Sequence, residues 1–188
     1  MHTIYCVLGR TASGKSSIVK RVAKDLNMKV LKSYTTRTMR KNETVANSDH
    51  IFINDSDVQN YREDMCAYTD RVGYCSFATF AQLQENDFYI INPTGYYELK
   101  LKTKNMDIQI KTIYITTPYQ LNLERAKKRG DLKTWKENYE AENQEFSSFE
   151  KSDLVDYRVL NNTTLDEAVE KLKKIIEKDK EKNVQTTD

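Results

Sequence analysis

The stretch VLGRTASGKSSIV, Val7 to Val19, decides the fold class of this 188-residue chain. Gly9 and Gly14 stand five residues apart in it, and Lys15 and Ser16 follow directly, which satisfies the pattern G-x-x-x-x-G-K-[ST]. The apolar run TIYCVLG, which ends at Gly9, predicts a buried strand. The apolar residues that follow Ser16 recur at helical spacing. A glycine turn between a strand and a helix is the setting in which this pattern binds phosphate groups, which argues against a chance match.

Each residue type in the pattern has a physical role in holding a nucleotide. Glycines let the backbone curl so that successive N–H groups point into a concavity for phosphate oxygens, and the helix N-terminus adds its dipole. Lys15 is expected to reach the β- and γ-phosphates, and the Ser16 hydroxyl is a candidate ligand for Mg²⁺. The predicted nucleotide-binding residues of this stretch are Gly9, Ser13, Gly14, Lys15, Ser16 and Ser17.

The rest of the chain alternates short β-rich runs with helix-period segments, which predicts an α/β domain with a parallel sheet flanked by helices. Further strands are expected at MKVLKS, FYIIN, IKTIYITT and VDYRVL. Pro118 is predicted to be the first residue of a helix, and Thr164 with Glu167 has the capping-box spacing that opens the last helix. We expect a single domain over residues 1–182, followed by a loose tail at 183–188.

Two segments interrupt this alternation. Residues 34–83 contain HIFIN, MCAYTD and GYCSF, which predict short half-buried strands with a polar helix between the first two, so a small inserted subdomain is expected. Residues 127–149 are polar and charged with few apolar anchors, which is typical of a mobile helical lid. Both segments are candidates for holding a substrate.

Composition restricts the possible partners. Lys plus Arg number 30 and Asp plus Glu number 28, so the net charge of +2 gives no reason to expect a nucleic-acid or membrane surface. Cys6, Cys66 and Cys75 are odd in number and lack metal-binding spacing, which fits a reducing compartment. No apolar run approaches the roughly 20 residues that span a bilayer, and the N-terminus has no signal pattern. The prediction is a cytoplasmic protein without a nucleic-acid or membrane partner.

The stretch SYTTRTMRKNE, Ser33 to Glu43, is the best candidate for binding the group that receives a phosphate. Arg37 and Arg40 stand three residues apart, next to hydroxyl residues and just past a predicted strand. Planar guanidinium groups in such a place suit a doubly charged phosphate. Charge alone is equally consistent with a solvated basic loop.

Together, GRTASGKSS and SYTTRTMRKNE resemble the guanylate kinase family of P-loop nucleoside monophosphate kinases, whose second signature runs S-x-T-T-R-x-x-R-x-x-E. Further similar stretches follow in the same order: DHIFI, GYCS, FYIINPTG, IYITTPYQLNLERAKKRG and VDYRVLNNTTLDEAVEKLKKII. The resemblance covers roughly residues 3–177. It implies a P-loop NTPase fold with a nucleoside-monophosphate-binding insertion at about 34–83 and a helical lid at about 127–149.

The resemblance also implies roles for residues of the acceptor site. Arg37, Arg40 and Tyr74 would hold the monophosphate of the acceptor nucleotide, and Ser33 and Ser76 would lie beside its base. ATP would be the phosphate donor, with Mg²⁺ as the metal ion.

Three residues late in the chain match positions near the donor nucleotide. Arg125 and Arg129 match lid arginines that flank the donor and neutralise charge on the transferred phosphoryl group. Without the resemblance, helix-surface charge balanced by Glu124 is the favoured explanation of both. Asn161 matches a loop residue near the donor adenine, or is a plain turn former. The implied catalytic residues are Lys15, Arg37, Arg125 and Arg129.

The positions that read the base depart from the family pattern. Guanine presents N–H donors, so a pocket that selects it needs acceptors, and the family supplies a glutamate and an aspartate. The corresponding residues here are Met65 and Asn92, so Asn92 is the predicted base-binding residue. Asp70, or Glu63 and Asp64, could supply a carboxylate if the strand register is shifted. An asparagine could instead pair with thymine or uracil.

Three other departures concern phosphate and metal. His50 replaces a family tyrosine and is either a phosphate contact or an ordinary strand residue. Asn138 stands in place of a third lid arginine. Ile90 replaces an acidic residue, so Mg²⁺ would depend on Ser16, phosphate oxygens and water.

The first expectation is therefore an ATP-dependent guanylate kinase, which converts GMP or dGMP and ATP to GDP or dGDP and ADP, working as a monomer or homodimer. One alternative is a kinase for another monophosphate, such as dTMP, dUMP or a modified nucleotide. The other is an interaction module of guanylate kinase type without catalysis.

Overall fold

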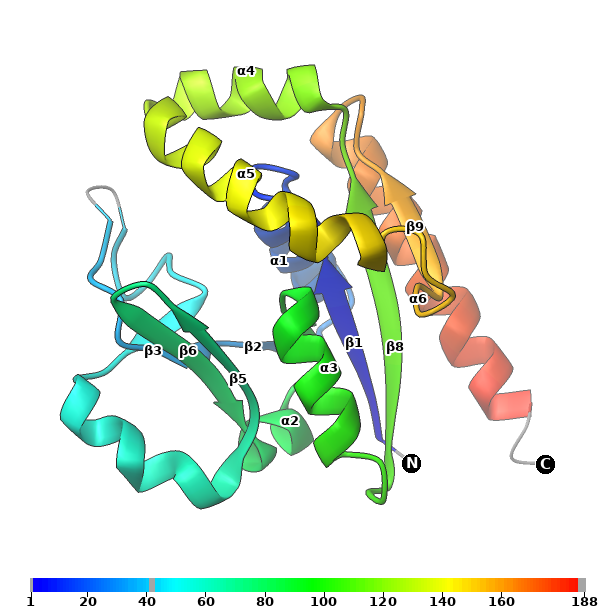
Figure 1. Ribbon diagram of the computed structural model, residues 1–188. Coiled ribbons are helices and arrows are strands. Elements are labelled where there is room, and N and C mark those ends of the chain that lie inside the picture. Colours follow the sequence, from blue (N-terminus) through cyan, green and yellow to red (C-terminus); the bar gives the residue numbers. More distant parts are fainter. Residues whose placement is uncertain (1, 41–42, 186–188) are drawn as a thin grey trace. The chain divides into compact units, whose positions relative to one another are not determined.

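The computed structural model describes residues 2–40 and 43–185 (Figure 1). Within these residues the chain forms two compact units. The first consists of Met1–Cys6 and Lys29–Lys111, and the second of Val7–Met28 and Thr112–Asp188, in each case for the part of the chain that the structure describes. The boundary runs through two strands, between Cys6 and Val7 and between Lys111 and Thr112.

A five-stranded sheet has the order β2-β7-β1-β8-β9. Its strands are β1 (His2–Leu8), β2 (Val30–Leu31), β7 (Phe88–Ile90), β8 (Ile108–Thr116) and β9 (Tyr157–Leu160). β2 pairs in parallel with β7, and β8 with β9. Parallel strands covered on both faces read as continuous apolar runs, and β1 follows this rule because Ile4 and Cys6 to Leu8 are fully buried. The predicted α/β class with a parallel sheet and flanking helices is confirmed.

The helices are α1 (Lys15–Asp25), α2 (Phe80–Glu85), α3 (Pro93–Lys102), α4 (Tyr119–Arg129), α5 (Leu132–Phe149) and α6 (Leu165–Gln185). In the second unit, α1 packs against α6. Thr164 caps α6 as predicted, because its hydroxyl accepts a hydrogen bond from the backbone N–H of Glu167 at 3.2 Å. Pro118 lies one residue before α4, at the N-cap rather than at the predicted first helical position. Residues 183–185 of the predicted loose tail are instead the end of α6, and residues 186–188 lie outside the described residues.

The first unit also contains a four-stranded sheet with the order β4-β3-β6-β5. Its strands are β3 (Ser33–Thr35), β4 (His50–Phe52), β5 (Met65–Arg71) and β6 (Tyr74–Thr79), and the 3₁₀ helix η1 (Asp55–Asp64) lies between β4 and β5 in the sequence. β3 is parallel to β4 and antiparallel to β6, which is antiparallel to β5. The three short strands predicted for this segment are therefore present, and the polar helix between the first two is a 3₁₀ helix.

The run MKVLKS forms two strands instead of the single predicted one. β2 ends at Leu31 and joins the five-stranded sheet, whereas β3 begins at Ser33 and joins the four-stranded sheet. Lys32 separates them, and its carbonyl accepts a hydrogen bond from Gln82 Nε2 at 2.8 Å instead of a strand partner. The apolar pattern does not mark this break, because both strands are partly buried.

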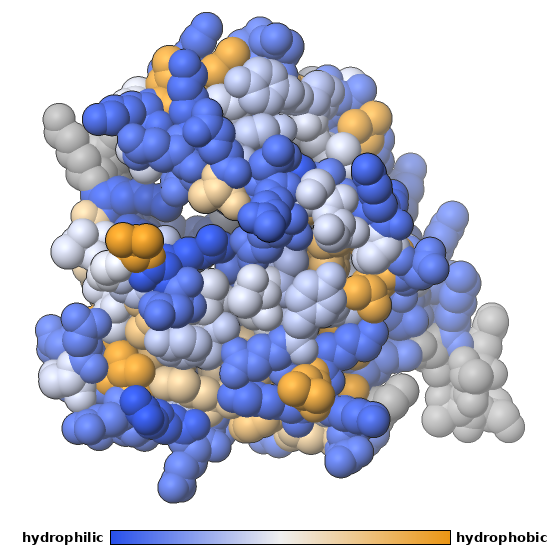
Figure 2. All heavy atoms as spheres, viewed as in Figure 1, coloured by the Kyte–Doolittle hydropathy of each residue, from blue (hydrophilic) through white to orange (hydrophobic). Residues whose placement is uncertain are grey.

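The face shown in Figure 2 is mostly hydrophilic, with hydrophobic residues scattered over it. Among the described residues, no helix is both long and apolar enough to cross a membrane, and no group of three His, Cys, Asp or Glu residues is arranged to hold a metal ion. All three cysteines are buried free thiols.

Candidate functional site

The glycine-rich loop between β1 and α1 lies in the second unit and has the curled backbone that the sequence predicts. Gly14 has a φ of 87° and Ala12 a φ of 63°, both in the left-handed region. A Cβ atom on Gly9 would lie 2.5 Å from the Ile115 carbonyl oxygen, and one on Gly14 would lie 2.6 Å from Asn161 Nδ2. Glycine is therefore required at both positions by close packing as well as by backbone conformation.

Lys15 folds back over this loop. Its ammonium group donates hydrogen bonds to the carbonyl oxygens of Gly9 and, at 2.9 Å, of Arg10. The loop thus places a positive charge among curled backbone amides at the N-terminus of α1, which is the arrangement that binds phosphate. The Ser16 hydroxyl makes no hydrogen bond within the described part of the chain, so it can serve as a ligand to a metal ion. Ser17 is exposed beside it.

Asn161 and Arg125 support the loop from behind. Asn161 is buried, its Nδ2 donates to the Ser13 carbonyl oxygen at 2.8 Å, and its Oδ1 accepts from Arg125 Nη2 at 3.2 Å. Arg125 Nη1 also reaches the Ser13 carbonyl at 3.4 Å, and burial lowers the pKa of this guanidinium. The Ser13 hydroxyl oxygen is buried and has no hydrogen-bond partner among the described residues. A buried polar atom without a partner at this loop is consistent with a ligand that supplies one.

Arg129, the second arginine matched to a lid, is not brought to this loop within the second unit. It lies at the end of α4 and pairs with Asp131 through Nε at 2.8 Å and Nη2 at 2.6 Å. Because both side chains are partly exposed, this pair contributes little stability and can be broken at small cost.

Helix α5 contacts the glycine-rich loop through charged and aromatic side chains. Arg10 Nε donates to Glu150 Oε1 at 2.7 Å, and the Thr11 backbone N–H donates to Glu142 Oε2 at 2.7 Å. Trp135 is buried, and its Nε1 lies 3.4 Å from the Thr11 carbonyl oxygen. Sequence analysis predicted a polar lid here but did not predict these contacts. Glu142 matters most, because its carboxylate binds a backbone N–H of the loop expected to bind phosphate.

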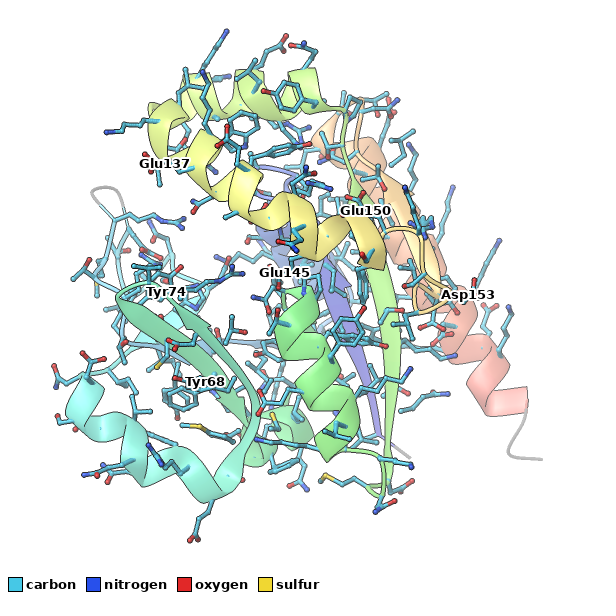
Figure 3. All side chains as sticks on the ribbon, in the orientation of Figure 1. Tyr68, Tyr74, Glu137, Glu145, Glu150 and Asp153 are labelled. Atoms are coloured by element: carbon cyan, nitrogen blue, oxygen red, sulfur yellow. The ribbon has the colours of Figure 1, made fainter. Side chains whose placement is uncertain are left out.

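Glu150 anchors the other end of α5, where Figure 3 shows it well separated from Glu137. Burial by itself would raise the pKa of Glu150, but hydrogen bonds from Arg10 and Tyr114 outweigh burial and hold the pKa below its usual value. A cavity of about 360 Å³ lies beside this network. Its lining includes Arg10 and Ser13 of the loop, Tyr114 of β8, Asn122 of α4, Tyr139 of α5, and Glu150.

In the first unit, Arg37 is held in place by Glu43. The two guanidinium nitrogens Nη1 and Nη2 donate to the two carboxylate oxygens at 2.9 and 3.0 Å. Glu43 also accepts from the Arg40 backbone N–H at 3.0 Å and from the Ser48 hydroxyl at 2.7 Å. Burial would raise the pKa of Glu43, but these hydrogen bonds lower it to about 2. Sequence analysis did not assign Glu43 a role, although it ends the stretch in which both arginines lie.

The candidate acceptor residues share one face of the four-stranded sheet. Ser33 pairs with His50 across β3 and β4, and their Oγ and Nδ1 atoms lie 2.9 Å apart. Burial, followed by the charge of Arg37, lowers the pKa of His50. Tyr74 and Ser76 are two residues apart on β6, so their side chains project from the same face, which also carries the β3 hydroxyls. Figure 3 shows Tyr74 near the β5–β6 turn. Arg40 is exposed in the loop that follows β3.

Of the acidic residues that could have supplied a carboxylate for a base, Glu63 and Asp64 are exposed at the end of η1, and Asp70 does not lie on this face. Met65 packs in the apolar cluster with Cys75 and Phe77. Asp70 pairs with Cys75 in the register of β5 and β6, and therefore projects from the opposite face to Ser76. A register shift that would bring Asp70 to the acceptor face is not observed.

The fold can be compared with known proteins. No protein-family model matches the sequence, and no curated protein does. Among solved structures, the chain is similar to the crystal structure of guanylate kinase from Anaplasma phagocytophilum, with a TM-score of 0.64 and 14% sequence identity. The similarity covers 95% of this chain and 86% of that chain. At this identity the likeness concerns the fold alone: the chain has an α/β fold like that of this guanylate kinase.

Proposed function

We propose that this protein is an ATP-dependent nucleoside monophosphate kinase, in which the segment at about 34–83 binds the acceptor and the segment at about 127–149 acts as a lid. The observation that carries the proposal is the glycine-rich loop with Lys15 folded over it and the unpartnered Ser13 hydroxyl beside it. Its curled backbone and charge suit the triphosphate of ATP. The oriented Arg37 of the first unit suits a second, separately bound phosphate.

The reaction needs positioning and charge neutralisation rather than a covalent intermediate. An oxygen of the acceptor phosphate would attack the γ-phosphorus of ATP in line with the departing ADP. Lys15 and the loop amides would hold the β- and γ-phosphates, while Arg37 and Arg40 hold the attacking phosphate. Mg²⁺, for which the Ser16 hydroxyl is the candidate protein ligand, would supply charge neutralisation between the phosphates. Water must be excluded, and a closing lid is the usual means.

The resemblance implies GMP or dGMP as acceptor. A second candidate, a kinase for a monophosphate with a different base such as dTMP or dUMP, is favoured by the places of Met65 and Asp70, which leave the acceptor face without either family carboxylate. A module that binds partners without catalysis has no need for Lys15 or for an open phosphate loop, and titration with ATP distinguishes it from both kinases.

A coupled assay of ADP formation, with ATP and a panel of ribo- and deoxynucleoside monophosphates, tests the proposal. Lys15→Ala should keep the far-UV circular dichroism of the wild type and lose at least about 100-fold in turnover, because it removes the side chain that neutralises the transferred group. Lys24→Ala, on an exposed position of the same helix, is the matched control and should keep full activity. Full activity in Lys15→Ala, or no diphosphate product from any monophosphate, would refute the proposal.

A further inference from the structure

The orientation of the Asn92 side chain is fixed by its neighbours in the first unit. Asn92 follows β7 and caps the N-terminus of α3, where its Oδ1 accepts from the Gly95 backbone N–H at 2.9 Å and from the Thr69 hydroxyl at 3.1 Å. A backbone N–H can only donate, so the atom that faces it must be the amide oxygen. A Cβ atom on Gly95 would lie only 3.0 Å from this oxygen, so Gly95 permits the close approach.

The amide nitrogen is therefore the part of Asn92 left for a ligand. Nδ2 carries two N–H donors and makes no hydrogen bond within the part of the chain that the structure describes, and the side chain is only half-buried. The family aspartate at this position can only accept hydrogen bonds when ionised. Asn92 thus offers a donor where a guanine-binding site of the family offers an acceptor.

The neighbouring hydroxyl groups have their protons committed to other atoms. The Thr35 hydroxyl donates to the Cys75 carbonyl oxygen at 2.8 Å, and the Ser76 hydroxyl donates to Thr35 Oγ1 at 2.9 Å. The Thr69 hydroxyl donates to Asn92 as described above. Ser76 and Thr69 are cross-strand partners, so they stand side by side. Each keeps lone pairs with which it can accept a hydrogen bond from a ligand.

This row of polar groups lies next to the arginine proposed to bind the acceptor phosphate. The Arg37 backbone N–H donates to Thr35 Oγ1 at 3.3 Å, so the row begins where the arginine loop leaves β3. The nearest carboxylate on α3 is occupied, because Glu98 accepts from the Tyr68 backbone N–H at 2.5 Å and pairs with Lys102 at 2.8 Å. The row consists of Asn92, Thr69, Ser76 and Thr35. Because Thr35 Oγ1 already accepts two hydrogen bonds, the row offers a ligand one amide donor and two hydroxyl acceptors, Thr69 and Ser76.

We propose that Asn92 makes the acceptor site selective for a base that presents a ring carbonyl next to a ring N–H and carries no amino group on that edge. Uracil, thymine and their 5-substituted derivatives have such an edge, with the N–H flanked by carbonyls on both sides. The Asn92 donor pairs with a carbonyl, and a hydroxyl of the row accepts from the ring N–H. An amino group opposite Nδ2 would place two donors against each other, and no carboxylate stands on the row to accept from it. The inference rests on the proposed function, since it concerns the acceptor site of that reaction.

Two pairs of nucleotides test this selectivity at constant ring size. In each pair only one member carries an amino group on the base edge. In dUMP and dCMP a carbonyl is exchanged for an amino group and the ring N–H is lost, and GMP carries an amino group that IMP lacks. We expect kcat/KM to be at least about 10-fold higher for dUMP than for dCMP and for IMP than for GMP, because an unpaired donor in a partly buried site is unfavourable. Higher kcat/KM for the amino-bearing member of either pair would overturn the inference and leave the proposed kinase activity standing.

Asn92→Asp should shift the preference toward the amino-bearing nucleotides. The carboxylate still accepts from the Gly95 N–H, so the N-cap of α3 is preserved, while its second oxygen replaces a donor by an acceptor. The ratio of kcat/KM for IMP over GMP should fall at least about 10-fold. Asn105→Asp makes the same charge change at an exposed turn and should leave both ratios unchanged. An unchanged ratio in Asn92→Asp would contradict the proposed role.

Calorimetric titration of the four monophosphates separates this inference from the proposed function. Stronger binding of dUMP and IMP without any turnover would support the base selectivity and refute the kinase. Stronger binding of dCMP and GMP would refute the selectivity, and binding of none of the four would refute both.

Discussion

Replacing Glu142 by alanine should strengthen ATP binding. In the structure the Glu142 carboxylate accepts a hydrogen bond from the Thr11 backbone N–H at 2.7 Å. Thr11 lies within the glycine-rich loop, whose N–H groups are expected to turn toward phosphate oxygens. A carboxylate bound there competes with the triphosphate for the same donor and repels its negative charge.

The size of the effect follows from this contact. A hydrogen bond that involves a charged group contributes about 1.5–3 kcal/mol, and the half-exposed position of Glu142 reduces this to about 1–1.5 kcal/mol. ATP must displace the contact in the wild type and not in Glu142→Ala. Because 1.4 kcal/mol corresponds to a factor of ten, we expect the variant to bind ATP about 5- to 12-fold more tightly.

Isothermal titration with ATP, with and without Mg²⁺, measures the change in Kd directly. The control is Glu137→Ala, which removes the same charge from an exposed position near the start of α5, far along the helix from Glu150 in Figure 3. Its Kd should match that of the wild type. Equal or weaker ATP binding by Glu142→Ala, with an unchanged control, would refute the view that this carboxylate competes with phosphate.

Two further predictions concern the stability of the fold, and a third concerns tryptophan fluorescence as a signal of nucleotide binding. Ala12→Gly should raise the free energy of unfolding in urea by about 0.5–1 kcal/mol, because Ala12 has a φ of 63° and glycine adopts this conformation without steric cost; a lower unfolding midpoint would count against this. The pKa of Glu43 lies at about 2 rather than 4.5, so its ionisation stabilises the fold above pH 4.5, and this contribution is lost as the pH falls toward 2. The wild type should therefore be more stable than Glu43→Gln by about 1–2 kcal/mol at pH 7, and the difference should shrink below pH 4.5; a difference independent of pH would contradict the ion pair. Trp135, the single tryptophan of the chain, contacts the Thr11 carbonyl, so ATP should change its fluorescence, and an unchanged spectrum at saturating ATP would show that the loop and α5 do not respond to the nucleotide.

The parts of the fold that depend on local sequence could be predicted. The glycine-rich loop is specified by two glycines that close packing demands, the strand before it is a continuous apolar run, and the helix after it has a clear apolar period. The break in MKVLKS could not be predicted, because Lys32 separates two strands that are each partly buried and only the pairing partners distinguish them. Apolar periodicity reports burial and not which sheet a strand joins.

Contacts between distant polar side chains could not be predicted either. Glu142 accepts a hydrogen bond from Thr11, and Glu150 accepts one from Arg10. Both contacts depend on how α5 packs after the chain turns at Gly130. The Asn92 position was identified from the sequence, but whether its amide would donate or accept was open. The Gly95 N–H decides this, and it does so only once the α3 cap has formed.

Transfer of label from [γ-³²P]ATP to a nucleoside monophosphate tests the central claim most directly. The protein is incubated with labelled ATP, Mg²⁺ and an equimolar mixture of dUMP, dCMP, IMP and GMP, and the products are separated by chromatography. We expect label to appear in nucleoside diphosphate in a one-to-one ratio with ADP, and mainly in the products of dUMP and IMP. Label found only in ATP and inorganic phosphate, while ATP and the monophosphates both bind, would contradict it.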